Sequence, residues 1–240
     1  EIYSYNFQSL LRWSPVTVEN GSVLYTAQYR TGSYQHWSGM GCAQTPLTHC
    51  GLPPELGRRW TVQTRVRAEL GRLSSAWVQS PAFVPERDTT LGPPRVNSVS
   101  ASPDSLLISA SPPVPPEHGD SLQFLVSYWE NSTPAAKHEL RVPHTLFQIG
   151  NLKESTVYCF SIQVELKIFS GHLLGEHRAP ECHTTALSEA TRAGYIIALF
   201  LGAFLALNLM VAALLFVWKH HQKIKYWAQP PLHIPSHFEE

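Results

Sequence analysis

Cysteines are the residues of this chain whose type and spacing most directly predict chemistry. The 240-residue sequence has four of them, Cys42 and Cys50 in the first half and Cys159 and Cys182 in the second. Three pairings are possible, and one bridge within each half is favoured because a bridge across two separately folding modules is unusual. Neither pair has metal-ligand spacing and no His cluster accompanies them, so we predict two structural disulfides and no metal site.

No catalytic arrangement is recognisable in the sequence. There is no Gly-x-Ser-x-Gly, no phosphate-binding glycine loop and no His-Glu-x-x-His, and the 12 His residues are scattered. With 18 basic and 18 acidic side chains the chain carries no net charge, so it lacks the basic footprint of a nucleic-acid-binding protein. We therefore expect a protein that is not an enzyme, needs no cofactor and recognises partners by shape and local contacts.

Two segments match the acceptor pattern for N-linked glycans. They are Asn20-Gly21-Ser22 and Asn131-Ser132-Thr133, and both lie in turn-rich stretches. The pattern is short enough to arise by chance, and Pro134 directly after the second disfavours its use. We predict Asn20 and Asn131 as glycosylation sites, with Asn20 the stronger of the two.

Arginines and a tryptophan recur between residues 65 and 78. Arg65 and Arg67 share one face of an expected strand, and Trp77 follows on the next strand after a turn. Guanidinium planes stack on an indole with a gain of about 0.5 to 2 kcal/mol. The sequence predicts a stack of Arg65, Arg67 and Trp77, and the alternative is a pair of solvated arginines beside a packed indole.

Alternating apolar residues predict the strands that must position these groups. The clearest segments are 60–70, 122–129 and 156–166, separated by stretches rich in Pro, Gly, Asn and Ser. Two prolines in the segment 88–94 interrupt any sheet, so we place a hinge there, whereas the prolines of 112–116 predict a loop. The sequence thus indicates two all-β modules, 1–90 and 91–187.

One uninterrupted apolar run extends from Gly194 to Trp218. Its 25 residues give a helix of roughly 37 Å, longer than the roughly 30 Å of bilayer hydrocarbon. Lys219, Lys223 and Lys225 follow the run, so the positive-inside rule predicts a cytoplasmic segment 219–240 and an N-terminus outside the cell. We expect a single-pass type I protein of the plasma membrane whose lysines contact anionic lipid.

A motif in the second module resembles the fibronectin type III fold. The segment 152–158 matches Leu-x-Pro-x-Thr-x-Tyr, with Glu154 in place of the proline. Tyr158 is then the candidate for a tyrosine corner, in which the hydroxyl bonds to backbone a few residues upstream. Its expected role is in the fold and not in binding.

Over nearly the whole chain, the sequence resembles the class II cytokine receptors. The resemblance is carried by the segments 65–78, 91–94, 128–130 and 157–159, and above all by Ile224-Lys225-Tyr226-Trp227 with Ile234-Pro235 and Glu239-Glu240. It implies two fibronectin type III β-sandwich modules, one transmembrane α-helix and a short cytoplasmic tail. The implied role is an accessory signal-transducing subunit that pairs with a ligand-binding chain, interferon-gamma being the expected cytokine. A subunit shared by interleukin-10-type cytokines and a non-signalling adhesion receptor are the alternatives.

The resemblance also implies two binding segments. Pro230, Pro231, Leu232, Ile234 and Pro235 correspond to the box-1 segment that docks a Janus-family kinase, although the paired prolines sit one position earlier than in the family pattern. The alternative is a proline-rich linker.

Ligand contacts are expected in loops at the ends of the first module and around the hinge. Tyr34, His36 and Trp37 are the candidates, because they lie in a Gly- and Ser-rich segment before Cys42. Each of them could instead fold back as loop packing.

Overall fold

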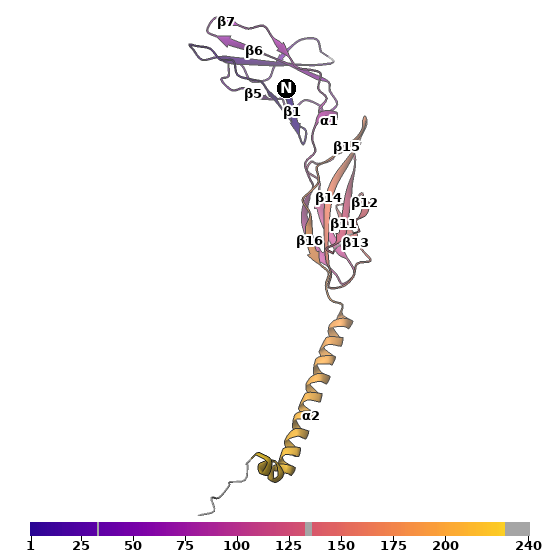
Figure 1. The fold of residues 1–240 in the computed structure, drawn as a ribbon. Coiled ribbons are helices and arrows are strands. Elements are labelled where there is room, and N and C mark those ends of the chain that lie inside the picture. The colour runs from indigo at the N-terminus through magenta and orange to yellow at the C-terminus, as the bar shows by residue number, and fades with distance from the viewer. Residues whose placement is uncertain (33, 133–135, 229–240) are drawn as a thin grey trace, which may run out of the picture. The chain divides into compact units, whose positions relative to one another are not determined.

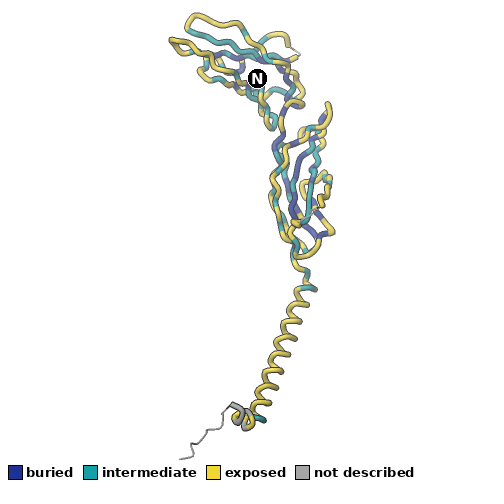
Figure 2. The backbone as a smooth tube through the Cα atoms, in the orientation of Figure 1, coloured by how far each residue is buried: buried dark blue, intermediate teal, exposed yellow. Residues whose placement is uncertain are grey.

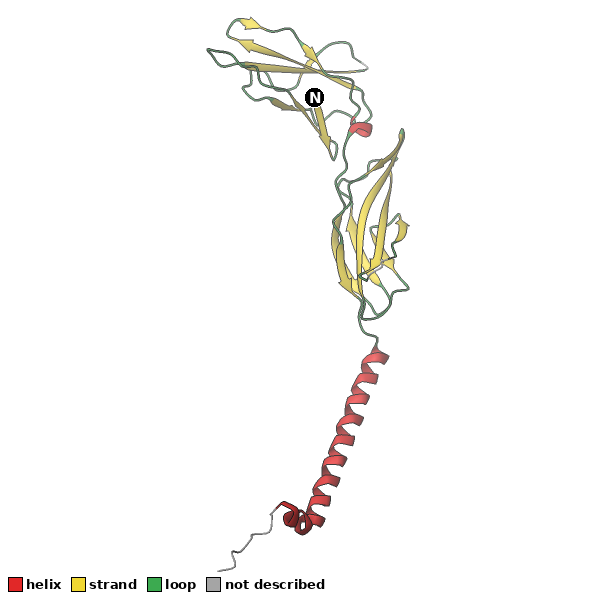
Figure 3. Ribbon diagram, viewed as in Figure 1, coloured by secondary structure: helices red, strands yellow, loops and turns green. Residues whose placement is uncertain are grey.

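Strands make up nearly all the regular structure of the first 186 residues, and a single long helix follows them. The computed structural model describes residues 1–32, 34–132 and 136–228, without the side chains of 222, 224 and 226–228. The chain divides into two units, Glu1–Ala186 and Leu187–Glu240. Figure 3 shows the division in secondary structure, with all strands of the described residues in the first unit.

The described residues of the first unit form sixteen strands and one short helix, arranged as Figure 1 shows. Residues 1–90 contain β1 (Ile2–Tyr5), β2 (Gln8–Arg12), β3 (Leu24–Thr31), β4 (Ser38–Gly39), β5 (His49–Gly51), β6 (Val62–Leu70), β7 (Leu73–Ser74), β8 (Val78–Gln79) and α1 (Pro85–Asp88). Residues 91–186 contain β9 (Arg95–Ala101), β10 (Leu106–Ser111), β11 (Ser121–Glu130), β12 (His138–Val142), β13 (Leu146–Ile149), β14 (Val157–Ile168), β15 (Gly171–Leu174) and β16 (Glu181–Thr184).

The first β-sandwich has one sheet in the order β1-β2-β5 and another in the order β4-β3-β6-β7, with β8 beside β6. Strands β3 and β6 are antiparallel, in register from Leu24 opposite Glu69 to Thr31 opposite Val62. The largest group of buried apolar residues between the sheets is Leu11, Ala27, Met40 and Cys50.

The second β-sandwich has the sheets β13-β10-β9 and β12-β11-β14-β15, with β16 beside β14. Its core is almost wholly enclosed, as the dark segments of Figure 2 show, and is built around Phe124, Val126, Phe160, Ile162 and Val164. These residues alternate along β11 and β14, so the alternation predicted for 122–129 and 156–166 is confirmed.

The strand predicted over 60–70 begins later than expected. β6 starts at Val62, and Trp60 lies in the preceding turn, where its N–H donates to the Gly57 carbonyl at 3.0 Å. The Trp60 side chain is therefore 50% exposed and not part of the buried face. Alternation alone did not indicate this turn, because Trp60 fits the period of the strand.

In its described part, the second unit consists mainly of the helix α2 (Glu189–Ala228), which is longer at both ends than the predicted 194–218. At its start Ser188 Oγ accepts a hydrogen bond from the Thr191 N–H at 3.2 Å, a normal N-terminal cap. At its other end, residues 219–229 contain no Gly or Pro, so the sequence has no helix-breaking residue directly after the apolar run. The segment Glu189–His221 is long and apolar enough to cross a membrane, and its apolar window is exposed all round.

Candidate functional site

Five side chains of the first sandwich form an alternating stack of cations and indoles. The Trp77 ring lies between Arg65 and Arg67, whose guanidinium carbons are 4.2 and 4.8 Å from the ring centroid. The Trp37 ring lies between Arg30 and Arg65, at 4.8 and 4.3 Å. The order is therefore Arg30, Trp37, Arg65, Trp77, Arg67, and the predicted contacts of Arg65, Arg67 and Trp77 are its second half.

Glutamines on the facing strands hold two of the three guanidinium groups of the stack, those of Arg30 and Arg65. Because β3 and β6 are antiparallel, Gln28 lies opposite Arg65 and Arg30 lies opposite Gln63. Arg65 donates from Nε and Nη2 to Gln28 Oε1 at 2.9 and 2.6 Å. Arg30 makes the same pair of bonds to Gln63 Oε1, at 2.9 and 2.6 Å. Arg30 and Arg65 are thus each held by two hydrogen bonds in addition to their contacts with the indole rings.

Three arginines on one face leave the stack with a surplus of positive charge. Burial lowers the pKa of Arg65, and the charges of Arg30 and Arg67 lower it further. Arg67 donates from Nε to Glu69 Oε1 at 2.7 Å, and this bond is the main reason that the pKa of Glu69 is lowered. Glu69 therefore supplies a counter-charge at one end of the stack, and Arg30 is at the other end.

The loop after β3 contains the three predicted ligand-contact residues, and the structure separates them. Tyr34 is 59% exposed and its ring meets that of His36 edge-on, with centroids 5.8 Å apart. Both line a hollow with Tyr29 and Trp60. Trp37 instead packs back into the stack, which is the loop-packing alternative. Contact of Tyr34 and His36 with a ligand stays a prediction.

Sequence reasoning missed two residues of this surface, Arg30 and Trp60. Arg30 belongs to the stack only because the register of β3 against β6 places it beside Trp37, and register is not visible in one sequence. Trp60 reaches the hollow because it precedes β6. The nearest available signal is the pair Arg58-Arg59 directly before it, which breaks the alternating pattern.

The segment predicted as a hinge is hydrogen-bonded to both sandwiches. The turn between β1 and β2 holds it from one side, because Gly92 N–H donates to Asn6 Oδ1 at 2.8 Å and Asn6 N–H donates to the Thr90 carbonyl at 2.8 Å. From the other side Glu176 N–H donates to the Leu91 carbonyl at 2.8 Å. The joint between the two sandwiches is thus held by hydrogen bonds from both of them.

A nearly buried ion pair reinforces this joint. Arg58 of the first sandwich donates to Asp120 Oδ2 at 2.7 Å and lies 2.7 Å from Glu117 Oε1, in the loop before β11. The side chains of Arg58 and Asp120 are only 10% and 1% exposed. The Arg58 guanidinium also covers the ring of Phe7, with its carbon 4.3 Å from the centroid. None of these residues stood out in the sequence.

The predicted disulfides and tyrosine corner are present. Cys42 is bonded to Cys50, and Cys159 is bonded to Cys182, which lies directly opposite it on β16. The Tyr158 hydroxyl accepts a hydrogen bond from the Lys153 N–H at 3.2 Å, and its ring is buried in the core. These features stabilise the fold.

The remaining predicted sites are exposed or lie outside the described residues. Asn20 and Asn131 are exposed, as a glycan requires, but Thr133 of the second acceptor motif is outside the described part of the chain. The segment with Pro230, Pro231, Leu232, Ile234 and Pro235 is also outside it. Glycan attachment and kinase docking therefore stay predictions.

Comparison with known proteins places both halves of the first unit in related families. The family described as tissue factor matches residues 1–77, and the fibronectin type III family of the interferon-alpha/beta receptor matches residues 89–185. The human interferon gamma receptor 2 is 30% identical over 260 aligned residues, which cover 100% of this chain and 76% of the relative. The chain belongs to the class II cytokine receptor family.

Other members of this receptor family support the same assignment. The mouse interleukin-10 receptor subunit beta is 28% identical and covers 99% of this chain and 68% of its own length. A solved structure of the chicken interferon gamma receptor alpha chain, 18% identical, covers 78% of this receptor and 96% of the chicken chain with a TM-score of 0.65. That likeness shows the fold, two fibronectin type III-like sandwiches in tandem.

Interferon gamma receptor 2 and interleukin-10 receptor subunit beta thus both occur among the relatives, at similar identities of 28% to 30%.

Proposed function

We propose that this receptor chain is the accessory, signal-transmitting subunit of an interferon-gamma receptor. The observation that carries the proposal is the 30% identity to the human interferon gamma receptor 2 along the entire chain, apolar helix included. The proposed division is 1–90 and 91–187 for the two modules, 194–218 for the span and 219–240 for the cytoplasmic segment.

The proposed mechanism is proximity. An extracellular cytokine brings this subunit together with a ligand-binding chain, and the kinases carried by the two chains then phosphorylate each other. Such a subunit requires only modest ligand contact, because the second binding event on a membrane is effectively intramolecular. The exposed aromatic rings of Tyr34 and His36 suit a small interface of this kind.

The proposed topology is single-pass type I in the plasma membrane. The support is the one apolar helix of the described residues, followed by Lys219, Lys223 and Lys225. In this orientation the proline segment after residue 228 lies in the cytoplasm beside the membrane. Lys219, Lys223 and Lys225 then lie close enough to the membrane surface to contact lipid headgroups.

Kinase docking is proposed for Pro230, Pro231, Leu232, Ile234 and Pro235. Prolines hold a segment extended without internal hydrogen bonds, so Leu232 and Ile234 enter a groove at a low cost in ordering. The supporting observation is the sequence motif itself together with its place shortly after α2.

Co-precipitation of a Janus-family kinase with the full chain tests this proposal. We expect a triple variant, Leu232→Ala, Ile234→Ala and Pro235→Ala, to lose the kinase. A matched triple variant at Ser236, His237 and Phe238 keeps it. Equal kinase recovery with both variants contradicts docking at this segment, and no recovery with the parent chain favours the adhesion receptor.

A subunit shared by interleukin-10-type cytokines is the second candidate. Identities of 28% and 29% to the mouse and human interleukin-10 receptor subunit beta favour it almost equally. Cytokine-dependent cross-linking on cells separates the two candidates. We expect interferon-gamma to be cross-linked, and exclusive cross-linking of an interleukin-10-type cytokine contradicts the first candidate.

A further inference from the structure

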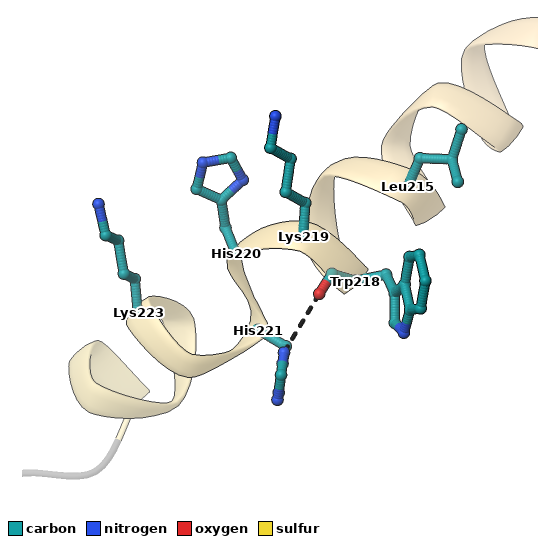
Figure 4. Close-up of a pocket in the computed structure, with 6 residues that line it drawn as sticks. All are labelled: Leu215, Trp218, Lys219, His220, His221 and Lys223. Carbon is teal, nitrogen blue, oxygen red and sulfur yellow. Dashed lines mark hydrogen bonds between the residues drawn. The ribbon is translucent and has the colours of Figure 1, made fainter.

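The end of α2 beyond the apolar run presents a basic face to its surroundings. Lys219 and Lys223 are exposed and four residues apart, so their Cβ atoms lie about 5–6 Å from each other on one side of the helix. Figure 4 shows both side chains extending to the same side together with His220, whereas Trp218 and His221 lie on the other side. His221 is turned back onto the helix, with Nδ1 3.1 Å from the Trp218 carbonyl oxygen.

Nothing nearby in the sequence neutralises this face. Residues 190–238 contain no Asp or Glu, so neither lysine has an acidic residue three or four positions away. Two ammonium groups in this relation repel each other on an isolated helix. This repulsion is removed when an anion from another molecule binds between the ammonium groups of Lys219 and Lys223.

The position of the two lysines along the helix indicates where such an anion lies. Tryptophan is typical of the boundary between hydrocarbon and headgroups, which places Trp218 there. At about 1.5 Å per residue, Lys219 and Lys223 lie about 1.5 and 7.5 Å beyond Trp218. The headgroup layer occupies roughly 5–7 Å on each side of the hydrocarbon, so both ammonium groups lie at the depth of the lipid phosphates.

We propose that Lys219 and Lys223 form a binding site for the phosphomonoester headgroup of an anionic phospholipid, a polyphosphoinositide. A phosphomonoester carries close to two negative charges on one group and so pairs with both lysines at once, which a singly charged headgroup does not. The inference rests on the proposed orientation, which places this end of α2 in the cytoplasmic leaflet, where anionic lipids are enriched. Lys225 lies on a different face, about 200° around the helix from Lys223.

The test is lipid retention by the full chain in nanodiscs of phosphatidylcholine with a small share of phosphatidylinositol bisphosphate. The retained lipid is counted by native mass spectrometry. We expect the double variant Lys219→Gln, Lys223→Gln to bind this lipid about 30-fold more weakly, about fivefold for each lysine. The control Arg192→Gln, Lys225→Gln removes the same charge away from the proposed site and changes binding less than about twofold.

Four results overturn the site. They are equal loss in both double variants, equal retention of phosphatidylserine at matched total charge, the same affinity for inorganic phosphate without lipid, and selective capture of an acidic protein in place of the lipid. Retention is measured without cytokine or kinase, so its failure leaves the receptor function untouched. Conversely, a chain that fails to recover kinase but keeps the lipid contradicts only the proposed function.

Discussion

The two β-sandwiches of this receptor have the same architecture but are stabilised by different interactions. The second encloses a main core cluster of twelve buried residues, whereas the largest cluster of the first has four, one of them the disulfide-bonded Cys50. The first has instead an ordered outer face in which arginines and tryptophans alternate. Apolar burial therefore dominates the second sandwich, and polar and stacking interactions take a larger share in the first.

The largest expected effect is in the second sandwich. Phe124 is fully buried, and its ring lies 6.2 Å from that of Phe147. Phe124→Ala leaves a cavity in the core, so we expect a loss of about 3–5 kcal/mol in the free energy of unfolding. Denaturant unfolding of the full chain measures it. Leu125→Ala, on the same strand but facing the other way, is the control and costs less than half as much.

The joint between the sandwiches is expected to give the next largest effect. Asp120→Ala leaves Arg58 nearly buried with Glu117 as its remaining acidic partner, which we expect to cost about 2–3 kcal/mol. Because the pair connects both sandwiches, this variant also weakens the coupling between their unfolding transitions. A control at Asp104, beyond this joint, leaves one cooperative transition. Two separate transitions already present in the parent chain contradict a joint that couples the sandwiches.

Sequence alone predicted those parts of the receptor that depend on local pattern. The alternation in β11 and β14, the disulfide pairs, the tyrosine corner and the apolar helix each rest on residue types at short spacing. Arg30 belongs to the stack because of the register between β3 and β6. Arg58 and Asp120 form their ion pair although they are 62 residues apart in the sequence. Such contacts are fixed by the packing of the whole unit, and no single segment carries a signal for them.

The stack of the first sandwich is expected to contribute less than the core of the second. Trp77→Ala removes the ring that lies between Arg65 and Arg67, so we expect a loss of about 1–2 kcal/mol in stability and lower surface expression. Trp60→Ala removes the same kind of ring outside the stack and is the control, with a change below about 0.5 kcal/mol. A Trp77 variant that melts and reaches the surface like the parent contradicts a stabilising stack.

The smallest expected effect concerns the acid dependence of the same stack. The hydrogen bond from Arg67 lowers the pKa of Glu69 below its ordinary 4.5, so between the two values the unfolded chain binds more protons than the folded chain. The stabilisation from Glu69 is therefore present above about pH 4.5 and is lost as the pH falls through the lowered pKa. Arg67 is 36% exposed, so solvent screens the pair and the contribution is only about a few tenths of a kcal/mol.

Glu69→Gln tests this acid dependence, because it removes the titrating group and keeps the shape of the side chain. We expect the variant to lose less stability than the parent between pH 5 and about pH 3. The measurement is thermal unfolding at a series of pH values, with Glu139→Gln on exposed β12 as the control. Asp88 and Glu181 also have lowered pKa values, so the Gln variant still loses some stability as the pH falls, but less than the parent. A steeper acid loss in the Gln variant means that Glu69 does not neutralise the arginine stack.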